Sequence, residues 1–218
     1  MPTANESTTL YNNGWIIKIH PPDHGPTNQM ILLLHGYSGD ENSMDVFTRS
    51  LPRDAWLISP RAPIPISTGG YSWSALPADS PKPAEALIEQ ARFLWLQIPE
   101  WQKLMKAGEE LLRSIVGFSQ GGAMALLLSL LYPSQVIKTA CLSGFLPEGT
   151  ETLLPYSILQ GRQYLIAHGV EDDIVPVVRA RQAAQTLQAR GAQVTYCENK
   201  VGHKVAASCL HSLSEFFC

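Results

Sequence analysis

The sequence has little charge and few cysteines. Only 16% of its 218 residues are charged, and the net charge is −3. No basic stripe follows from this composition, so nucleic acid is not an expected partner. The four cysteines show neither metal-ligand nor redox spacing, so we expect neither a metal site nor a cofactor here, and free thiols in a reducing compartment. They are Cys141, Cys197, Cys209 and Cys218.

Long apolar runs are also missing. The longest, residues 123–131, is interrupted by Ser129 and is far too short to span a membrane. Residues 1–10 are polar and lack the basic and apolar regions of a secretory signal. We therefore expect a cytoplasmic protein without a membrane span. A chain of 218 residues, 45% of them hydrophobic, predicts a single domain over residues 1–218.

Apolar strand patterns alternate with helical patterns along almost the whole chain. This order predicts the α/β class, with a mainly parallel central sheet and helices on both faces. Expected strands are residues 14–20, 29–34, 55–59, 114–118, 136–142, 162–167 and 192–198. Expected helices are residues 41–51, 83–98, 120–132, 177–190 and 204–217, with Pro99 breaking or kinking the second and a second short helix running to about residue 112. Residues 60–83 predict a long loop rich in Pro, Gly and Ser.

One pentapeptide between an expected strand and an expected helix contains a candidate nucleophilic serine. It is Gly117-Phe118-Ser119-Gln120-Gly121, a G-x-S-x-G pattern. In a nucleophile elbow the serine sits on a sharp, strained turn, and the small residues on either side let strand and helix approach closely. The strand and helix that flank Ser119 favour this interpretation over chance.

A serine nucleophile needs a base within hydrogen-bond reach and an acid that orients the base. The acid candidates are Glu171, Asp172 and Asp173, which position alone does not separate. The alternative is an acidic cluster stabilised by the dipole of the next helix. The base candidate is His203, which lies between the last strand and the last helix. Its alternative role is to cap that helix.

The developing oxyanion would need two backbone N–H donors. One belongs to the residue after the serine, Gln120, and the other to a loop after an earlier strand, where we choose Tyr37. The alternative is that the Gly-rich loop 35–39 only turns the chain. His35 and His168 each end a strand before a glycine, and we interpret both as structural histidines that hold their loops by hydrogen bonds.

Assembled in this order, the motifs resemble the phospholipase/carboxylesterase family of α/β hydrolases, which includes acyl-protein thioesterases. The resemblance rests on residues 34–40, 59–63, 70–73, 117–125, 142–147, on His168-Gly169 with Asp172 and Val175-Pro176, and on Gly202-His203. It implies an α/β-hydrolase fold and a serine hydrolase of carboxylic esters or thioesters. It further implies Ser119 as nucleophile, Asp172 as acid and His203 as base, with Tyr37 and Gln120 at the oxyanion positions.

Two features depart from the family pattern. Residues 83–112 are longer than the family needs and are placed to shape or cover the site. Asp173 stands where many members have proline, which bears on the choice of the acid.

The expected function is hydrolysis of short- to medium-chain acyl esters without metal or cofactor. The alternatives are a thioesterase or lysophospholipase acting on longer acyl chains, and a non-catalytic ligand-binding relative. The partner would be a small-molecule ester or thioester, and the protein a monomer or homodimer. The residues expected to bind the substrate are Tyr71, Trp73, Phe145, Leu146 and Val175. For Trp73 the alternative is that it anchors the long loop to the core.

Overall fold

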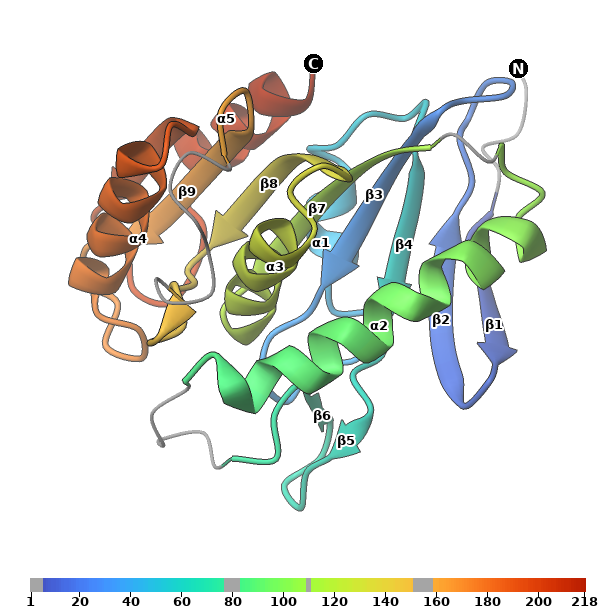
Figure 1. The fold of residues 1–218 in the computed structure, drawn as a ribbon, viewed down its shortest axis with the longest axis horizontal. Helices are drawn as coiled ribbons and strands as arrows, with labels where there is room; N and C mark the ends of the chain where they lie inside the picture. The colour runs from blue at the N-terminus through green and yellow to red at the C-terminus, as the bar shows by residue number, and fades with distance from the viewer. Residues whose placement is uncertain (1–5, 77–82, 109–110, 151–158) are drawn as a thin grey trace.

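The computed structural model describes residues 6–76, 83–108, 111–150 and 159–218. Its centre is an eight-stranded sheet in the order β1-β2-β4-β3-β7-β8-β9-β10 (Figure 1). Only β2 runs antiparallel to its neighbours, and every other pair in the sheet is parallel. The strands are β1 (Thr8–Asn12), β2 (Trp15–His20), β3 (Gln29–Leu34), β4 (Trp56–Pro60), β7 (Leu112–Phe118), β8 (Val136–Leu142), β9 (Gln163–Gly169) and β10 (Gln193–Asn199). The mainly parallel sheet expected from the sequence is confirmed.

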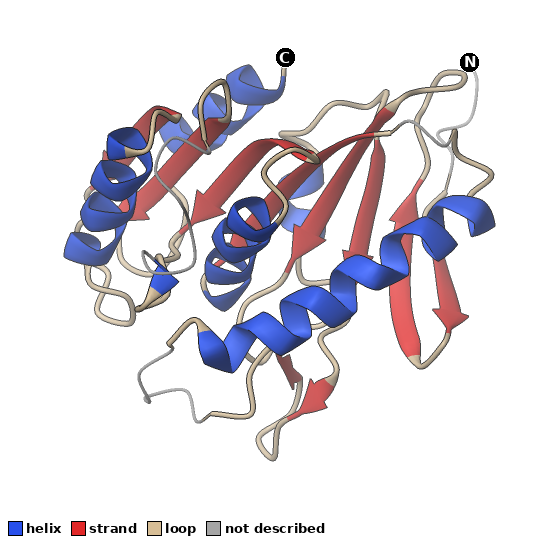
Figure 2. Cartoon of the chain, viewed as in Figure 1, coloured by secondary structure: helices blue, strands red, loops and turns tan. Residues whose placement is uncertain are grey.

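Helices cover both faces of the sheet, as the sequence predicts (Figure 2). One face carries α2 (Glu85–Leu104), α3 (Gln120–Leu131) and α4 (Val177–Ala189). The other carries α1 (Asp45–Thr48) and α5 (Ala207–Phe217). Along β3, Leu32 and Leu34 pack toward α2 and α3, while Ile31 and Leu33 pack toward α1 and α5. A strand covered on both sides is apolar at successive positions rather than alternate ones, which explains this run.

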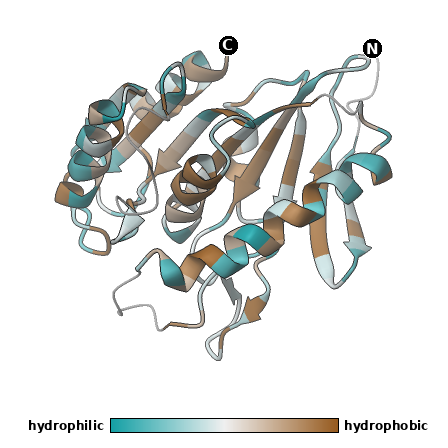
Figure 3. Ribbon diagram, in the orientation of Figure 1, coloured by the Kyte–Doolittle hydropathy of each residue, from teal (hydrophilic) through white to brown (hydrophobic). Residues whose placement is uncertain are grey.

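Helix α3 lies over the middle of the sheet and is apolar around most of its circumference (Figure 3). All residues from Gln120 to Leu130 are buried. Its neighbours are β7, β8, β3 and α2, so no side of this helix faces water over most of its length. A helix that is apolar all round is typical of the interior of a protein.

The predicted break at Pro99 is wrong. Helix α2 continues through Pro99 as far as Leu104. A proline inside a helix costs about 3 kcal/mol, but the buried face persists beyond it, with Ile98 and Trp101 both in the core. Burial of such side chains offsets the cost. Residues 83–112 were expected to shape or cover the site. Most of this region forms α2, whose buried face is part of the hydrophobic core.

The helix expected over residues 41–51 is reduced to α1, and residues 41–44 form turns. The Asp40 carboxylate accepts from the Asn42 backbone N–H (2.9 Å) and from Ser43 Oγ (3.0 Å). Such local side-chain bonds give the backbone an alternative to the helix.

Two elements of the structure were not predicted. Strand β1 forms a hairpin with β2 through Asn13-Gly14, both at positive φ, and this dipeptide is the sequence signal that could have found it. The loop 60–83 contains a small two-stranded sheet, β5 (Ile64–Pro65) with β6 (Tyr71–Ser72). Within the described ranges no helix is long and apolar enough to cross a membrane.

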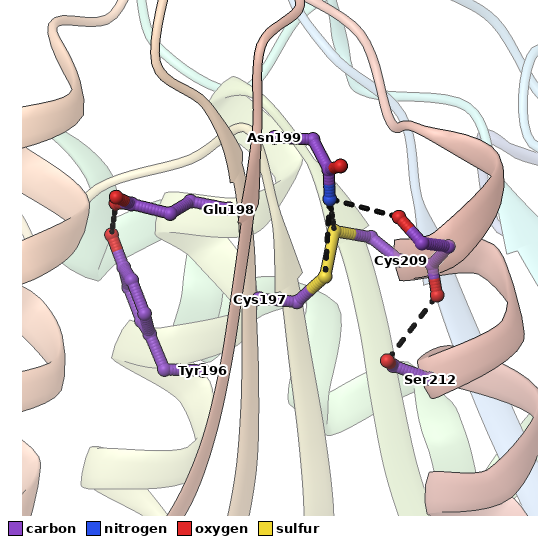
Figure 4. Close-up of a disulfide and its surroundings, with 7 residues drawn as sticks. Tyr196, Cys197, Glu198, Asn199, Cys209 and Ser212 are labelled. Carbon is purple, nitrogen blue, oxygen red and sulfur yellow. Dashed lines mark hydrogen bonds between the residues drawn. A yellow bond between two sulfur atoms is a disulfide. The ribbon is translucent and has the colours of Figure 1, made fainter.

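Two of the four cysteines are joined, contrary to the expectation of free thiols. Cys197 on β10 forms a disulfide with Cys209 in the first turn of α5 (Figure 4). Alternation along β10 turns Cys197 toward α5, while Tyr196 and Glu198 point to the other side of the strand. The two cysteines meet because α5 packs against β10, and their spacing in the sequence does not indicate a disulfide. Cys141 and Cys218 are free, and burial raises the pKa of the Cys141 thiol to about 12.

We predict that replacing both Cys197 and Cys209 by alanine lowers the free energy of unfolding by about 3 kcal/mol, the loop-closure entropy of a loop of roughly this length. Urea denaturation followed by circular dichroism measures the change. The control is Cys218→Ser, which alters an exposed free thiol. Equal urea midpoints for the double variant and the wild-type protein would contradict the prediction.

Candidate active site

Ser119 lies on the turn between β7 and α3 and has the backbone angles φ 54° and ψ −118°. Residues other than glycine rarely adopt these backbone angles, and residues strained in this way cluster at functional sites. The Ser119 N–H donates to the carbonyl of Leu142 at the end of β8 (2.8 Å), which holds the turn in place. The elbow geometry expected from the pentapeptide is present.

Glycine is required on both sides of the turn. A Cβ on Gly117 would overlap the backbone of Gly121, and a Cβ on Gly121 would overlap the carbonyls of Leu34 and His35. The elbow therefore packs backbone against backbone, both within itself and against the end of β3. This contact also sets Gly36 beside the serine, since a Cβ on Gly36 would lie 3.2 Å from Ser119 Cβ.

The structure brings three of the candidate side chains into one line of hydrogen bonds. His203 Nε2 lies 3.0 Å from Ser119 Oγ, and His203 Nδ1 lies 2.7 Å from Asp172 Oδ2. These residues follow β7, β9 and β10, at the carboxyl ends of parallel strands, where ligands of open α/β sheets bind. A carboxylate only accepts, so His203 donates from Nδ1 and presents the lone pair of Nε2 to the serine hydroxyl.

Geometry separates the acid candidates, which the sequence left open. Asp172 is buried, and its Oδ1 accepts from the backbone N–H groups of Ile174 (3.0 Å) and Val175 (2.8 Å). Glu171 and Asp173 are exposed. Among the described residues the Asp173 side chain has no hydrogen bond, and Asp172 takes the nearby N–H donors.

The proposed oxyanion donors belong to two segments that meet at Ser119. Gln120 follows it in the chain, and Tyr37 follows Gly36, which packs against it. Over the described loops and turns, no backbone carbonyl accepts from either N–H. Both amides are thus unpaired within the described protein backbone, as donors to a substrate oxygen must be.

His35 holds the Tyr37 loop, as the sequence predicts for a structural histidine. The Ala62 N–H donates to His35 Nε2 (2.9 Å), so Nδ1 carries the proton and donates to the carbonyl of Gly36 (2.7 Å). Burial lowers the pKa of His35 below its usual 6.5. The neutral ring therefore ties the end of β3 to the segment after β4.

The interpretation of Trp73 as a substrate-binding residue is wrong. Its side chain is 0% exposed, and its Nε1–H donates to the carbonyl of His35 (2.8 Å). The Gln120 side chain is buried beside it and accepts from the Trp73 backbone N–H (3.0 Å) while donating to Ser72 Oγ (3.0 Å). The alternative role, anchoring the long loop, is the observed one, and the anchoring function of the Gln120 amide was not predicted.

A second anchor was also missed by sequence reasoning. Arg61 donates from Nε and Nη2 to the Glu41 carboxylate (2.6 and 2.7 Å) and from Nη1 to the Tyr71 hydroxyl (3.1 Å). The Arg61 guanidinium lowers the pKa of Glu41. Tyr71 is thus held under Arg61, with its backbone N–H on the carbonyl of Gly39 (3.0 Å). The fixed pair of donors in Arg61 sets the distance between the two loops.

A cavity of about 550 Å³ lies on the side of α1 and α5, and its lining includes Phe118 and Lys204, the chain neighbours of Ser119 and His203. It is mainly apolar, and Lys204 is the charged residue in its lining. Its walls are Gly36, Tyr37, Ser38, Gly39, Ser43, Met44, Val46, Phe47, Phe118, Lys204, Val205 and Leu210.

The residues expected to bind substrate do not line this cavity. Phe145 is nearly buried below the guanidinium of Arg179 (4.8 Å), and Val175 is buried beside Asp172. Leu146 lines a separate cavity of about 330 Å³. The cavity is instead lined by residues of the motifs 34–40 and 117–125 and by residues of α1, α5 and the segment after His203. No three His, Cys, Asp or Glu side chains in the described ranges form a metal-ligand group.

Comparison with known proteins agrees with this architecture. Residues 17–218 match the Phospholipase/Carboxylesterase family. The chain belongs to this family, and its fold is the α/β-hydrolase fold. A probable carboxylesterase of rice (Oryza sativa subsp. japonica) is 34% identical over 109 residues, which cover 47% of this chain and 39% of the rice protein. The matched part therefore spans well under two thirds of that relative.

Solved structures show the same fold at low identity. A carboxylesterase from Mesorhizobium loti superposes with a TM-score of 0.79 at 19% identity, covering 96% of this chain and 97% of that one. The Bacillus cereus carboxylesterase gives 0.76 at 18% identity, covering 94% of each. Arabidopsis thaliana SOBER1 gives 0.72 at 22% identity, covering 88% and 98%. At these identities the likeness concerns the fold alone.

We predict that His35 makes the protein lose stability on acidification. Its pKa is lowered in the folded state, so the unfolded chain binds the proton first as the pH falls below 6.5, and the free energy of unfolding declines from there. His35→Gln should flatten the fall in melting temperature between about pH 7 and pH 5, and the exposed His24→Gln should not. Equal slopes for wild type and His35→Gln would contradict the assignment.

Proposed function

We propose that the chain hydrolyses carboxylic esters with short- to medium-chain acyl groups, through an acyl-enzyme on Ser119. The observation that carries the proposal is the line of hydrogen bonds from Ser119 Oγ through His203 to Asp172, starting at a strained elbow. Nucleophile, base and orienting acid are recognised by this geometry rather than by fold. Family membership supports the same reaction class.

The acylation step follows from the positions of the protons. His203 Nε2 takes the proton of Ser119 Oγ as Oγ attacks the acyl carbon, and the carbonyl oxygen becomes an oxyanion. The N–H groups of Tyr37 and Gln120 are the proposed donors to that oxyanion. When the ester C–O bond breaks, His203 returns the proton to the departing alcohol.

Deacylation repeats the sequence with water. His203 removes a proton from water as the water oxygen attacks the acyl carbon, and the proton then goes to Ser119 Oγ as the carboxylic acid leaves. Asp172 keeps the Nδ1 proton on His203 through both steps, and so preserves the tautomer that has its lone pair on Nε2.

The cavity has room and an apolar lining for an acyl group. Its volume of about 550 Å³ falls in the lower half of the usual range of ligand pockets, roughly 300–1,000 Å³. Phe47, Phe118 and Leu210 give it apolar walls suited to an acyl chain. A thioester or a lysophospholipid would use the same chemistry, so a panel of substrates decides between them.

The compartment and the oligomeric state stay predictions. A cytoplasmic location was inferred partly from free thiols, and the Cys197–Cys209 disulfide counts against a strongly reducing compartment, where such bonds are rare. Monomer and homodimer are both compatible with the proposed site, which one chain completes.

We predict that a fluorophosphonate probe labels Ser119 and that Ser119→Ala abolishes labelling. Turnover of p-nitrophenyl butyrate should fall by about 10³-fold or more, as for removal of other triad serines. The control Ser114→Ala changes a serine of β7, the strand that leads into the Ser119 turn, and should leave both readouts unchanged. If Ser119→Ala kept its activity, another nucleophile would have to be found and the proposal would fail.

Val46 provides a test of the acyl pocket. It lines the cavity yet is 71% exposed, so Val46→Lys should fold normally. We expect it to raise KM for octanoyl esters and thioesters while leaving acetyl esters unaffected, because the charge replaces apolar surface along the longer chain. Val178→Lys is the matched control, an exposed valine on α4 outside the cavity. A larger effect of Val178→Lys than of Val46→Lys would indicate that the acyl chain binds on the side of α4.

A further inference from the structure

His168 is a buried histidine that the proposed mechanism does not use. It lies at the end of β9, next to Gly169, and is 2% exposed. Its Nε2 is 2.8 Å from the carbonyl oxygen of Val175 and 3.3 Å from Asp172 Oδ2. The second contact connects it directly to the proposed acid.

The hydrogen-bond partners fix the tautomer of His168. The carbonyl of Val175 only accepts, so His168 Nε2 carries a proton. Its Nδ1 is buried and has no hydrogen-bond partner among the described residues, so a proton there would be left unpaired. The ring therefore donates from Nε2 to the Val175 carbonyl, and the same N–H-bearing nitrogen lies 3.3 Å from Asp172 Oδ2.

The Asp172 carboxylate is held from several directions. Oδ1 accepts from the N–H groups of Ile174 and Val175, Oδ2 accepts from His203 Nδ1, and the N–H-bearing Nε2 of His168 lies 3.3 Å from Oδ2. His168 also donates to the carbonyl of Val175, whose own N–H binds Oδ1. Rotation of the carboxylate would break several bonds at once, in an environment where an unpaired polar atom is costly.

We propose that His168 is a positioning residue that holds Asp172 Oδ2 toward His203 Nδ1. This inference rests on the proposed function, in which Asp172 maintains the tautomer of His203. Without the His168 N–H, the Val175 carbonyl loses its donor and Oδ2 loses the positive N–H edge 3.3 Å away, so His203 alone sets the direction of Oδ2. The reactive orientation of His203 is then less populated, which lowers kcat without altering the acyl pocket.

The test compares variants that keep or remove the donor. His168→Gln places an amide N–H near the position of Nε2 and should retain kcat within a few-fold. His168→Leu removes the donor and His168→Asn is too short to reach Asp172, so each should lower kcat by about 10–100-fold, as loss of comparable supporting hydrogen bonds does. KM for p-nitrophenyl butyrate should not change, because the cavity residues are untouched.

A second readout separates positioning from mere destabilisation. The downfield proton resonance of His203 Nδ1–H reports its hydrogen bond to Asp172, and we expect it to shift or disappear in His168→Leu and His168→Asn but not in His168→Gln. Leu165→Ala is the control, since Leu165 is a buried residue of β9 packed on the other side of the sheet. It should lower the melting temperature and leave the resonance and kcat unchanged.

The outcomes distinguish this inference from the proposed function. If Ser119→Ala and Asp172→Asn are inactive while His168→Asn or His168→Leu retains wild-type kcat and the resonance, only the role of His168 is overturned. The same holds if His168→Gln is as impaired as His168→Leu. If Ser119→Ala retains activity, the proposed function itself fails. Should His168→Leu not fold, His168→Asn carries the same comparison.

Discussion

The site depends on one backbone contact at the centre of the sheet, where Gly121 lies against the carbonyls of Leu34 and His35. This contact brings the start of α3 to within touching distance of the end of β3. Any side chain at Gly121 would push the helix away and carry the serine with it. Because α3 is buried on nearly all sides, it has no other position to adopt. Ser119, the proposed nucleophile, and the Gly36–Tyr37 loop are therefore placed together by packing.

Asp172 and His203, the proposed acid and base, are placed together by a second backbone contact. Gly169 at the end of β9 lies against the carbonyls of Val201 and Gly202, where a Cβ would overlap both. The N–H of Glu171 also donates to the carbonyl of Val201 (3.0 Å). The loops that carry Asp172 and His203 are thus joined before their side chains meet. The disulfide between Cys197 and Cys209 closes the His203 loop at its base, linking β10 to α5 (Figure 4).

The sequence pattern correctly predicted the elements whose conformation is set by neighbouring residues in the chain. The glycines around Ser119 and the apolar run of β3 indicated strand, elbow and helix, because each follows from sterics within a few residues. The resemblance selected Asp172 from three neighbouring carboxylates, and position alone did not. The structure gives the reason, since only the middle residue of Glu171-Asp172-Asp173 turns inward to the N–H groups of the following turn. Pro99 and Trp73 were misjudged because long-range burial decided both.

The two histidines that end strands before glycine have complementary roles, although the sequence presents them alike. His35 receives the Ala62 N–H on Nε2 and donates from Nδ1, so it binds two backbone segments near the Tyr37 loop. His168 donates from Nε2 to the Val175 carbonyl and leaves Nδ1 unpaired within the described chain. The same Nε2 lies next to the Asp172 carboxylate. The difference arises from what faces each ring, a backbone donor in one case and acceptors in the other. A buried imidazole adapts to both because its proton can sit on either nitrogen. The same residue type can therefore stabilise an N–H-presenting loop and a carboxylate on opposite sides of one serine.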